Sequence, residues 1–409
     1  MSFTGRSSRR GDADALAEVL FDLTILATST RVRGIGRYLV ELAPALQRAA
    51  ERSGRVRMSF LERSAWVGGG RVSDDARASI ARLLGTPEPE PRMAWAYRQR
   101  VGLARATRRR GARLLHLGYP NVTPLGDAGC PRVLTCHDLI PQKFPKQYRA
   151  WQDGYSAGRR ALDARRYRGA RHIIAISQAT ADDLMALVGI PAERISVVHN
   201  GVSLERWSAE LTPTDEALRA RYGLGARRLL VYAGDGDYRK NADGMFAALA
   251  LVRRRRPSSD FTLVWLGKLG AETRRRILRH AAEAGVRNAV RLLGWVPDQM
   301  LAGFYRIAHA TLFVSRAEGF GYPVLEAMAT GSAVVTSNTS SLVELAGDVA
   351  LTVDPERPAA IADAVLSVAT GDPARRARVE AGRRWVARFS VERQAEATLD
   401  VYERVLRES

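Results

Sequence analysis

The sequence alternates short apolar segments with longer segments of helical pattern over most of its length. The apolar segments of the first half are VLFDLTIL (19–26), RMSFLE (57–62), RLLHLG (113–118), RVLTCHD (132–138), RHIIAIS (171–177) and RISVVHN (194–200). Those of the second half are RLLVYAG (228–234), FTLVWLG (261–267), VRLLGW (290–295), ATLFVS (310–315), AVVTS (333–337) and VALTVD (349–354). Continuous apolar strands between helices are typical of parallel sheets that helices bury on both faces. The pattern therefore predicts an α/β fold.

A polar stretch divides the two sets of strands. Residues 201–225 follow a strand of the first half, and a new strand begins near Arg228. We therefore predict two Rossmann-like domains, an N-terminal domain over 1–203 and a C-terminal domain over 204–390. Ligands of such sheets bind beyond the carboxyl ends of the strands. The site is accordingly expected in a cleft lined by loops that follow strands.

Arginine dominates the charge of the chain. The formal net charge is +20 at pH 7, and lysine occurs only at Lys143, Lys146, Lys240 and Lys268. A solvated basic surface, an anionic membrane face, anionic substrates and nucleic acid all fit such a charge. The arginine runs lie on separate elements without a nucleic-acid-binding motif or an aromatic stacking platform. Nucleic acid is therefore the least favoured partner.

Nothing in the sequence indicates a membrane span or a secreted chain. No apolar run approaches the roughly 18 residues that cross a bilayer, and the N-terminus lacks the apolar segment of a signal peptide. The two cysteines, Cys130 and Cys136, have no cluster of metal-binding residues around them. We expect a cytoplasmic protein, with the inner face of the cell membrane as a further location.

Two loops of the first half follow strands and carry candidate site residues. Gly34 and Gly36 lie in RVRGIGRY (31–38), before a helical segment, where main-chain amides and the helix dipole favour an anion. A plain turn is the alternative there. His137 ends the strand in TCHDLIP (135–141). It either meets a sugar through its ring or its carbonyl oxygen, or is an ordinary histidine at a strand end.

The loop GDGDYRKN (234–241) follows the first strand of the second half. Arg239 and Lys240 offer a bidentate fork and a point charge, which together suit a diphosphate. Asp235 and Asp237 are spaced as in a metal-binding DxD motif. The adjacent cations already supply the charge of a metal, and aspartate is a common turn residue. We therefore predict no metal here.

The segment RAEGFGYPVLEAMATG (316–331) combines a glycine turn with two glutamates. It follows a buried strand, and its proline and its last glycine suit the start and the end of a helix. Glu318 on the turn is placed to meet a transferred sugar, and Glu326 on the helix is placed to accept from vicinal ribose hydroxyls. The turn itself supplies amides for phosphate or sugar oxygens, from Gly319, Phe320, Gly321 and Tyr322.

These segments resemble the retaining glycosyltransferases of family 4, which have the GT-B architecture. Glu318 and Glu326 match the E-x7-E motif of that family within EGFGYPVLEAMATGSAVVTSN. Further similar segments are RLLGWVPDQMLAGFYRIAHATLFVSR, IIAISQATADDL, GIPAERISVVHNGV and the tail RFSVERQAEATLDVYERVL. The resemblance extends over nearly all of the second half and much of the first. The GDGDY insertion departs from the family, in which a proline-rich turn usually precedes the lysine.

The resemblance implies a role for each matching position. Glu326 would hold the donor ribose, Glu318 would contact the sugar, and Arg239 with Lys240 would neutralise the leaving diphosphate. Amides of Gly34 or Gly36 would reach the same phosphates, and His137 would reach the donor sugar. The segment VRLLGWVP (290–297), including Val296, would flank the base. The C-terminal helix, within 391–409, would pack back on the N-terminal domain.

The resemblance implies a retaining, metal-independent hexosyltransferase that needs no cofactor. The donor would be a GDP- or UDP-linked sugar, with GDP-mannose favoured, and the acceptor a saccharide, a glycolipid or a natural product. A GT-B epimerase or a sugar-phosphate synthase is the alternative. The segment from Trp95 to Arg110 interleaves apolar residues with arginines. It would either lie on an anionic membrane or pack as an ordinary helix of the fold.

Overall fold

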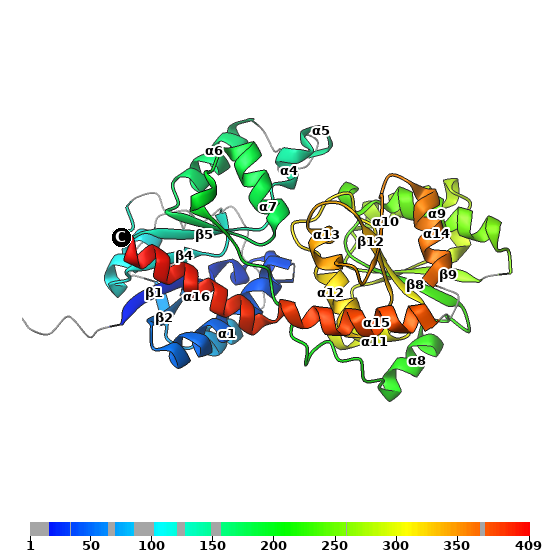
Figure 1. The fold of residues 1–409 in the computed structure, drawn as a ribbon, viewed down its shortest axis with the longest axis horizontal. Coiled ribbons are helices and arrows are strands. Elements are labelled where there is room, and N and C mark those ends of the chain that lie inside the picture. Colours follow the sequence, from blue (N-terminus) through cyan, green and yellow to red (C-terminus); the bar gives the residue numbers. More distant parts are fainter. Residues whose placement is uncertain are drawn as a thin grey trace, which may run out of the picture. The chain divides into compact units, whose positions relative to one another are not determined.

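The computed structural model describes residues 16–32, 34–63, 70–85, 102–120, 127–148, 157–258, 260–368 and 373–409. Within these residues the chain forms a seven-stranded and a six-stranded sheet, with helices between most successive strands (Figure 1). This confirms the prediction of two α/β sheets. The first sheet ends with β7 and the second begins with β8, so the chain passes from one sheet to the other between Val197 and Arg228.

The first sheet has the strand order β3-β2-β1-β4-β5-β6-β7. Its strands are β1 (Ala17–Asp22), β2 (Val56–Arg63), β3 (Arg71–Ser73), β4 (Leu114–Leu117), β5 (Arg132–Cys136), β6 (His172–Ala175) and β7 (Ile195–Val197). β1 pairs in parallel with β2 and β4, whereas β3 is antiparallel to β2. The apolar pattern does not predict β3, which has three residues at the edge of the sheet.

The first predicted strand ends earlier than its apolar run. The main-chain amide of Thr24 donates to the carboxylate of Asp22 at 2.9 Å. The chain then turns into two 3-10 segments, Thr24–Ala27 and Ser29–Val32, before α1 begins. The apolar residues after Asp22 are buried in this turn and not in a strand.

The helices associated with the first sheet include one from the end of the chain. They are α1 (Gly34–Ser53), α2 (Ala76–Leu84), α4 (Ile140–Lys143), α5 (Pro145–Tyr148), α6 (Ala157–Arg168), α7 (Gln178–Asp183) and α16 (Val391–Arg407). α16 lies against β4, because Tyr402 shares a hydrogen bond of 2.5 Å with Nδ1 of His116 (Figure 1). Nε2 of His116 is 2.8 Å from the hydroxyl of Thr135, and all three side chains are fully buried.

The second sheet has the strand order β10-β9-β8-β11-β12-β13. Its strands are β8 (Arg228–Ala233), β9 (Phe261–Leu266), β10 (Val290–Gly294), β11 (Ala310–Phe313), β12 (Val334–Ser337) and β13 (Leu351–Val353). Each neighbouring pair is parallel. The strands β8, β9, β11 and β12 are almost wholly buried, as the continuous apolar runs predict, whereas the edge strands β10 and β13 are only partly buried.

Helices lie on both sides of this second sheet (Figure 1). They are α8 (Pro213–Arg221), α9 (Ala242–Arg255), α10 (Ala271–Glu283), α11 (Asp298–Arg306), α12 (Tyr322–Ala329), α13 (Ser341–Ala346), α14 (Pro358–Val368) and α15 (Pro373–Val386). A buried ion pair joins α8 to α11. Nε and Nη2 of Arg306 lie 2.6 Å and 2.8 Å from the two carboxylate oxygens of Asp215.

Contacts divide the chain into two compact units whose boundary differs from the predicted one at residue 203. The first unit holds the described residues up to Thr135, with Arg166–Ile173 and Ala395–Ser409. The second holds Cys136–Arg165 and Ile174–Gln394. The difference arises because loops after β5 and β6 bond to loops of the second sheet. Ser177, for example, donates to the carbonyl oxygen of Gly319 at 2.9 Å.

None of the helices in the described part of the chain combines the length and the apolar character needed to cross a membrane.

Candidate active site

The candidate site lies where the second sheet reverses its strand order. β8 pairs with β9 on one side and with β11 on the other, with Leu230 opposite Ala310 and Val231 opposite Thr311. Because β8 and β11 are parallel, the loops at their carboxyl ends are neighbours. Such a reversal is the usual ligand-binding point of an open α/β sheet. The loops in question are 234–241 after β8 and 314–321 after β11.

The loop after β8 is held by hydrogen bonds to its main chain. Nε1 of Trp265 donates to the carbonyl oxygen of Gly234 at 3.1 Å. The hydroxyl of Tyr232 donates to the main-chain carbonyl oxygen of Asp235 at 3.2 Å. The carboxylate of Asp237 accepts from the amide of Arg239 at 3.0 Å. This caps the 3-10 turn Tyr238–Lys240, which carries both cations.

Asn241 ends this turn in the left-handed region, with φ of 58°. Its fully buried side chain donates to the carbonyl oxygens of Val314 at 3.0 Å and of Pro355 at 2.7 Å. It also accepts from the amide of Gly244 at 3.2 Å and so caps α9. One side chain therefore fixes the end of the cationic turn against the loop after β11.

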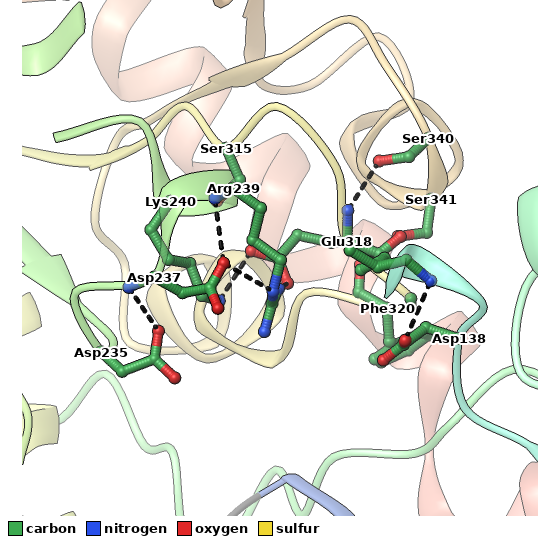
Figure 2. A network of polar contacts seen from close by, with 12 residues as sticks. Asp138, Asp235, Asp237, Arg239, Lys240, Ser315, Glu318, Phe320, Ser340 and Ser341 are labelled. Atoms are coloured by element: carbon green, nitrogen blue, oxygen red, sulfur yellow. Dashed lines mark hydrogen bonds and ion pairs between the residues drawn. The ribbon is translucent and has the colours of Figure 1, made fainter. Parts of the chain in front are cut away.

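The charged side chains of the two loops form one cluster (Figure 2). Nζ of Lys240 lies 2.7 Å from Oε1 of Glu318, and the guanidinium of Arg239 bonds to Oε2 of the same carboxylate. Nε of Arg239 is also 3.8 Å from Oδ1 of Asp237. Nζ of Lys240 lies 5.0 Å from the centre of the Phe313 ring, within reach of a cation–π contact.

Burial and charge act against each other on Glu318, whose side chain is 6% exposed. Burial by itself would raise the pKa of this carboxyl. The positive charges of Arg239 and Lys240, with the hydrogen bond from Lys240, outweigh that effect and hold the pKa of Glu318 below its usual range. Burial opposes the charge of Arg239 as well, but Glu318 and the neighbouring aspartates raise the pKa of Arg239 above its ordinary value. Glu318 and Arg239 are therefore both ionised.

The loop after β11 is fixed by serines. The hydroxyl of Ser340 accepts from the amide of Glu318 at 3.0 Å. The hydroxyl of Ser341 donates to the carbonyl oxygens of Glu318 at 3.0 Å and of Phe320 at 2.5 Å. Gly319 lies so close to His137 that a Cβ atom at 319 would overlap the carbonyl oxygen of His137. Only glycine fits this position without a shift of the chain.

The buried turn before α12 has main-chain amides that are available to a ligand. Within the described residues, the amides of Gly319, Phe320 and Gly321 donate to no protein acceptor. Buried amides normally have a partner, so three neighbouring donors without one make a site suited to an anion or to sugar oxygens. The aromatic rings of Phe320 and Tyr322 pack edge to face at 5.2 Å, beneath this turn.

Glu326 lies inside α12 with only 1% of its surface exposed. The hydroxyl of Tyr305, in α11, donates to Oε2 of Glu326 at 3.4 Å. The motif correctly predicts a helical position for Glu326, but not the tyrosine that orients its carboxylate.

The remaining predicted residues lie on other loops and at the start of α1. His137 follows β5 and is half-buried, and Val296 is 7% exposed between β10 and α11. Gly34 and Gly36 belong to the first unit, in the first turn of α1. A Cβ atom at Gly36 would overlap the main chain of Arg31, whereas Gly34 has open space around it.

Sequence reasoning missed several residues that shape this site. The hydroxyl of Tyr148, in α5, donates to Oδ1 of Asp237 at 2.5 Å. The serines at 177, 340 and 341 and Tyr305 were not singled out either. Their side chains are distant from the motif in sequence, and the main-chain atoms they bond become neighbours only in the fold. Ser340 does have a distinguishing feature, a positive φ of 53°, but sequence pattern does not reveal it.

Two further predictions can be located in the structure. Asp235 accepts from the amide of Asp237 at 3.3 Å, so both aspartates act in the turn. In the proposed membrane segment, residues 95–101 lie outside the described residues, and residues 102–110 are helical. Leu103 is 1% exposed, packed within the protein, and Arg110 is paired with Glu18 at 2.7 Å. This part of the segment packs as an ordinary helix.

Solved structures with the same architecture define the class of this protein. A HepE protein from Anabaena, solved in complex with UDP and glucose, superposes with a TM-score of 0.69. The match covers 95% of this chain and 99% of that one at 16% identity, so it establishes the fold alone. That fold is GT-B, with two Rossmann-like domains.

Family models identify the chain more closely. The model of glycosyl transferases group 1 matches residues 215–385, and that of glycosyltransferase family 4 matches residues 32–206. The chain belongs to the GT-B glycosyltransferases of the family 4 type and is a glycosyltransferase.

Two curated relatives illustrate the similarity. The O-antigen chain mannosyltransferase B of Escherichia coli is 29% identical over 381 residues, which are 90% of this chain and 95% of the relative. A D-inositol 3-phosphate glycosyltransferase of Xylanimonas cellulosilytica is 35% identical over 239 residues, 56% of each chain. Both are transferases, so they do not favour the alternative of an epimerase.

Proposed function

We propose that this glycosyltransferase moves a hexose from a nucleoside diphosphate sugar to a saccharide, lipid-linked or natural-product acceptor. Transfer would retain the anomeric configuration and need no metal or cofactor. The observation that carries the proposal is the joint placement of Arg239, Lys240 and Glu318 with the unpaired amides of the next turn.

Arg239 and Lys240 would bind the diphosphate of the donor. The costly event in glycosyl transfer is departure of the leaving group from an oxocarbenium-like centre. Cations and amide dipoles that are already fixed stabilise the negative charge that develops on that group, without reorganisation during the reaction. Asn241 and the capped turn hold the two cations in place before any ligand arrives. The amides of Gly319, Phe320 and Gly321 would add neutral donors.

Glu318 would serve the site in two ways. Its carboxylate orients Arg239 and Lys240 through direct ion pairs. A carboxylate accepts up to about four hydrogen bonds, so Glu318 can also meet hydroxyls of the transferred sugar. The donor diphosphate would therefore compete with Glu318 and Asp237 for Arg239 and Lys240.

Glu326 would hold the ribose, with His137 at the donor sugar and Val296 beside the base. The hydroxyl of Tyr305 donates a long hydrogen bond of 3.4 Å to one oxygen of Glu326. These roles rest on the matched motif positions.

Retention is proposed through attack on the same face of the sugar, with the leaving phosphate accepting the acceptor's proton. Glu318 is the nearest carboxylate, but both of its oxygens are engaged by cations, which makes it a poor nucleophile. Mass spectrometry of the enzyme with a slow donor analogue tests this, because a glycosyl adduct on Glu318 would contradict same-face attack. Proton NMR of the product would establish the anomeric configuration.

Mannose is the proposed sugar, because the relative with the longest match above is named a mannosyltransferase. A thermal-shift screen with GDP, UDP, GDP-mannose and UDP-glucose, in the presence and absence of EDTA, tests donor and metal together. A ligand at 100 times its dissociation constant should stabilise the protein by about 2.7 kcal/mol. Stabilisation by none of these ligands, or only when a divalent metal is present, would contradict the proposal.

A further inference from the structure

A cavity of about 210 Å³ lies in the first unit, away from the loops described above. Its lining comes from the amino ends of three strands and from the last turns of α16. The lining residues are Ala17, Arg55, Val56, Arg113, Glu403, Leu406 and Arg407. Parallel strands begin at one edge of a sheet and end at the other, so this cavity is at the edge opposite the carboxyl ends of β1, β2 and β4.

The charge of the lining is positive. Three arginines face one glutamate, since Glu403 pairs with Arg55 at 2.9 Å and with Arg407 at 3.5 Å. Asp400, outside the lining, is 3.5 Å from Arg55. For the guanidinium of Arg113, the described part of the chain offers no hydrogen-bond or ion-pair partner. The cavity thus has more cationic groups than its own carboxylates neutralise.

The size and the walls of the cavity limit what it can bind. Sites for drug-sized ligands have volumes of about 300–1,000 Å³, so this one is too small for a whole nucleotide sugar. Val56 and Leu406 give it an apolar wall beside the arginines. Arginine binds phosphate oxygens with a planar fork of donors. A phosphate joined to a short carbon skeleton would match both the charged and the apolar parts of the lining.

We propose that this cavity is a second anion site, which takes a phosphomonoester between Arg113 and Arg407. A phosphomonoester group occurs both in soluble phosphorylated metabolites and in the headgroups of phosphorylated lipids, and either would fit this lining. A bound phosphate would join the amino end of β4 to the last turn of α16. Because α16 supplies residues to both compact units, the ligand would stabilise the docking of this helix on the first unit.

The test measures binding of three probes to the whole protein by calorimetry and thermal shift. The probes are inorganic phosphate, glycerol phosphate, and phosphatidylcholine vesicles with or without phosphatidic acid. The variants are Arg113→Ala, Arg407→Ala and their combination. Arg254→Ala, at the exposed end of α9 in the second unit, is the matched control. All three substitutions replace exposed side chains, so the four variants are expected to fold.

Wild type and the control should bind glycerol phosphate or the acidic vesicles equally well. Loss of either cavity arginine should weaken that binding about tenfold or more, and the double variant should show no stabilisation by the ligand. Binding of glycerol phosphate alone would identify a soluble ligand, and binding of acidic vesicles alone a lipid headgroup. If no probe binds, or if the double variant binds like the control, the proposal is wrong.

Discussion

Nζ of Lys240 lies 2.7 Å from Oε1 of Glu318, although 78 positions separate the two residues in the sequence. The contact joins the loops that follow β8 and β11, at the point where the second sheet reverses its strand order. It places the buried carboxylate of the E-x7-E motif against the cations assigned to the leaving diphosphate. The donor would therefore meet cations that are already engaged with a protein anion.

Replacement of Lys240 by alanine should lower kcat by about 100- to 1,000-fold, the usual effect of losing one donor to a developing negative charge. Arg239 would still pair with Glu318, so the fold should be retained. Steady-state kinetics of sugar transfer are the measurement, with Arg254→Ala as the surface control. Wild-type turnover in the Lys240 variant would show that Lys240 does not stabilise the leaving diphosphate.

Substitution of Glu318 by glutamine should lower the stability of the free protein but increase its stabilisation by a nucleoside diphosphate. The variant keeps the shape of the side chain but leaves Arg239 and Lys240 buried without their anion, which should cost about 3–5 kcal/mol of unfolding free energy. A nucleoside diphosphate can replace that anion, so it should raise the Tm of the variant by more than that of wild type, while kcat falls. Equal ligand-induced shifts in both proteins would contradict competition between Glu318 and the diphosphate.

The ion pair between Asp215 and Arg306 should make the free energy of unfolding depend on pH in the acidic range. Burial disfavours the charged carboxylate, but the bonds from Arg306 and Thr212 outweigh this and lower the pKa of Asp215. The unfolded chain therefore binds this proton at a higher pH than the folded one. The stabilisation is complete above the unfolded pKa of about 3.9 and is lost as pH falls towards the folded value.

Asp215→Asn should accordingly lower the free energy of unfolding at pH 7 by about 3–5 kcal/mol. Its loss of stability between pH 5 and pH 3 should be smaller than that of wild type. Urea unfolding across this pH range is the measurement. Parallel pH profiles for the two proteins would show that Asp215 is not the titrating group.

Two substitutions of Asn241 can separate the effect of its backbone conformation from the effect of its side-chain hydrogen bonds. Asn241→Ala removes the bonds to Val314 and Pro355 and also places a Cβ atom at a φ of 58°. Asn241→Gly removes the same bonds, but glycine adopts this conformation at no steric cost. The alanine variant should therefore be less stable than the glycine variant by about 1–2 kcal/mol. Denaturant unfolding compares them, and equal stability would indicate that the turn relaxes.

The strands were predictable because a buried parallel strand leaves a continuous apolar run in the sequence. β8 and β11 are examples, and so are the loops at their ends, where Lys240 and Glu318 lie. The direct pairing of these two side chains was not predictable, because it depends on β11 lying next to β8. The hydrophobic pattern of each strand does not indicate which strands will be neighbours in the sheet.

The supporting residues were hidden for a related reason. Tyr148 and Ser341 bond to Asp237 and to the main chain of Glu318, but neither belongs to a recognisable pattern. β3 was missed because three residues are too few to show an alternation. The early end of β1 depends on one hydrogen bond from Thr24 to Asp22, which an apolar run cannot indicate.

α16 follows the second sheet in the sequence, and this sets the order of events during synthesis. Because Tyr402 completes the hydrogen bonds of His116, the first sheet waits for a helix that is made after the second sheet. At translation rates of about 5–20 residues per second, the stretch between Val197 and Val391 takes roughly 10–40 s to emerge. Throughout that interval the first unit lacks Leu399 and Val405 of α16, both of which are buried in the complete fold. Removal of α16 should therefore destabilise the first unit more than the second, since Ala395–Ser409 belongs to the first unit.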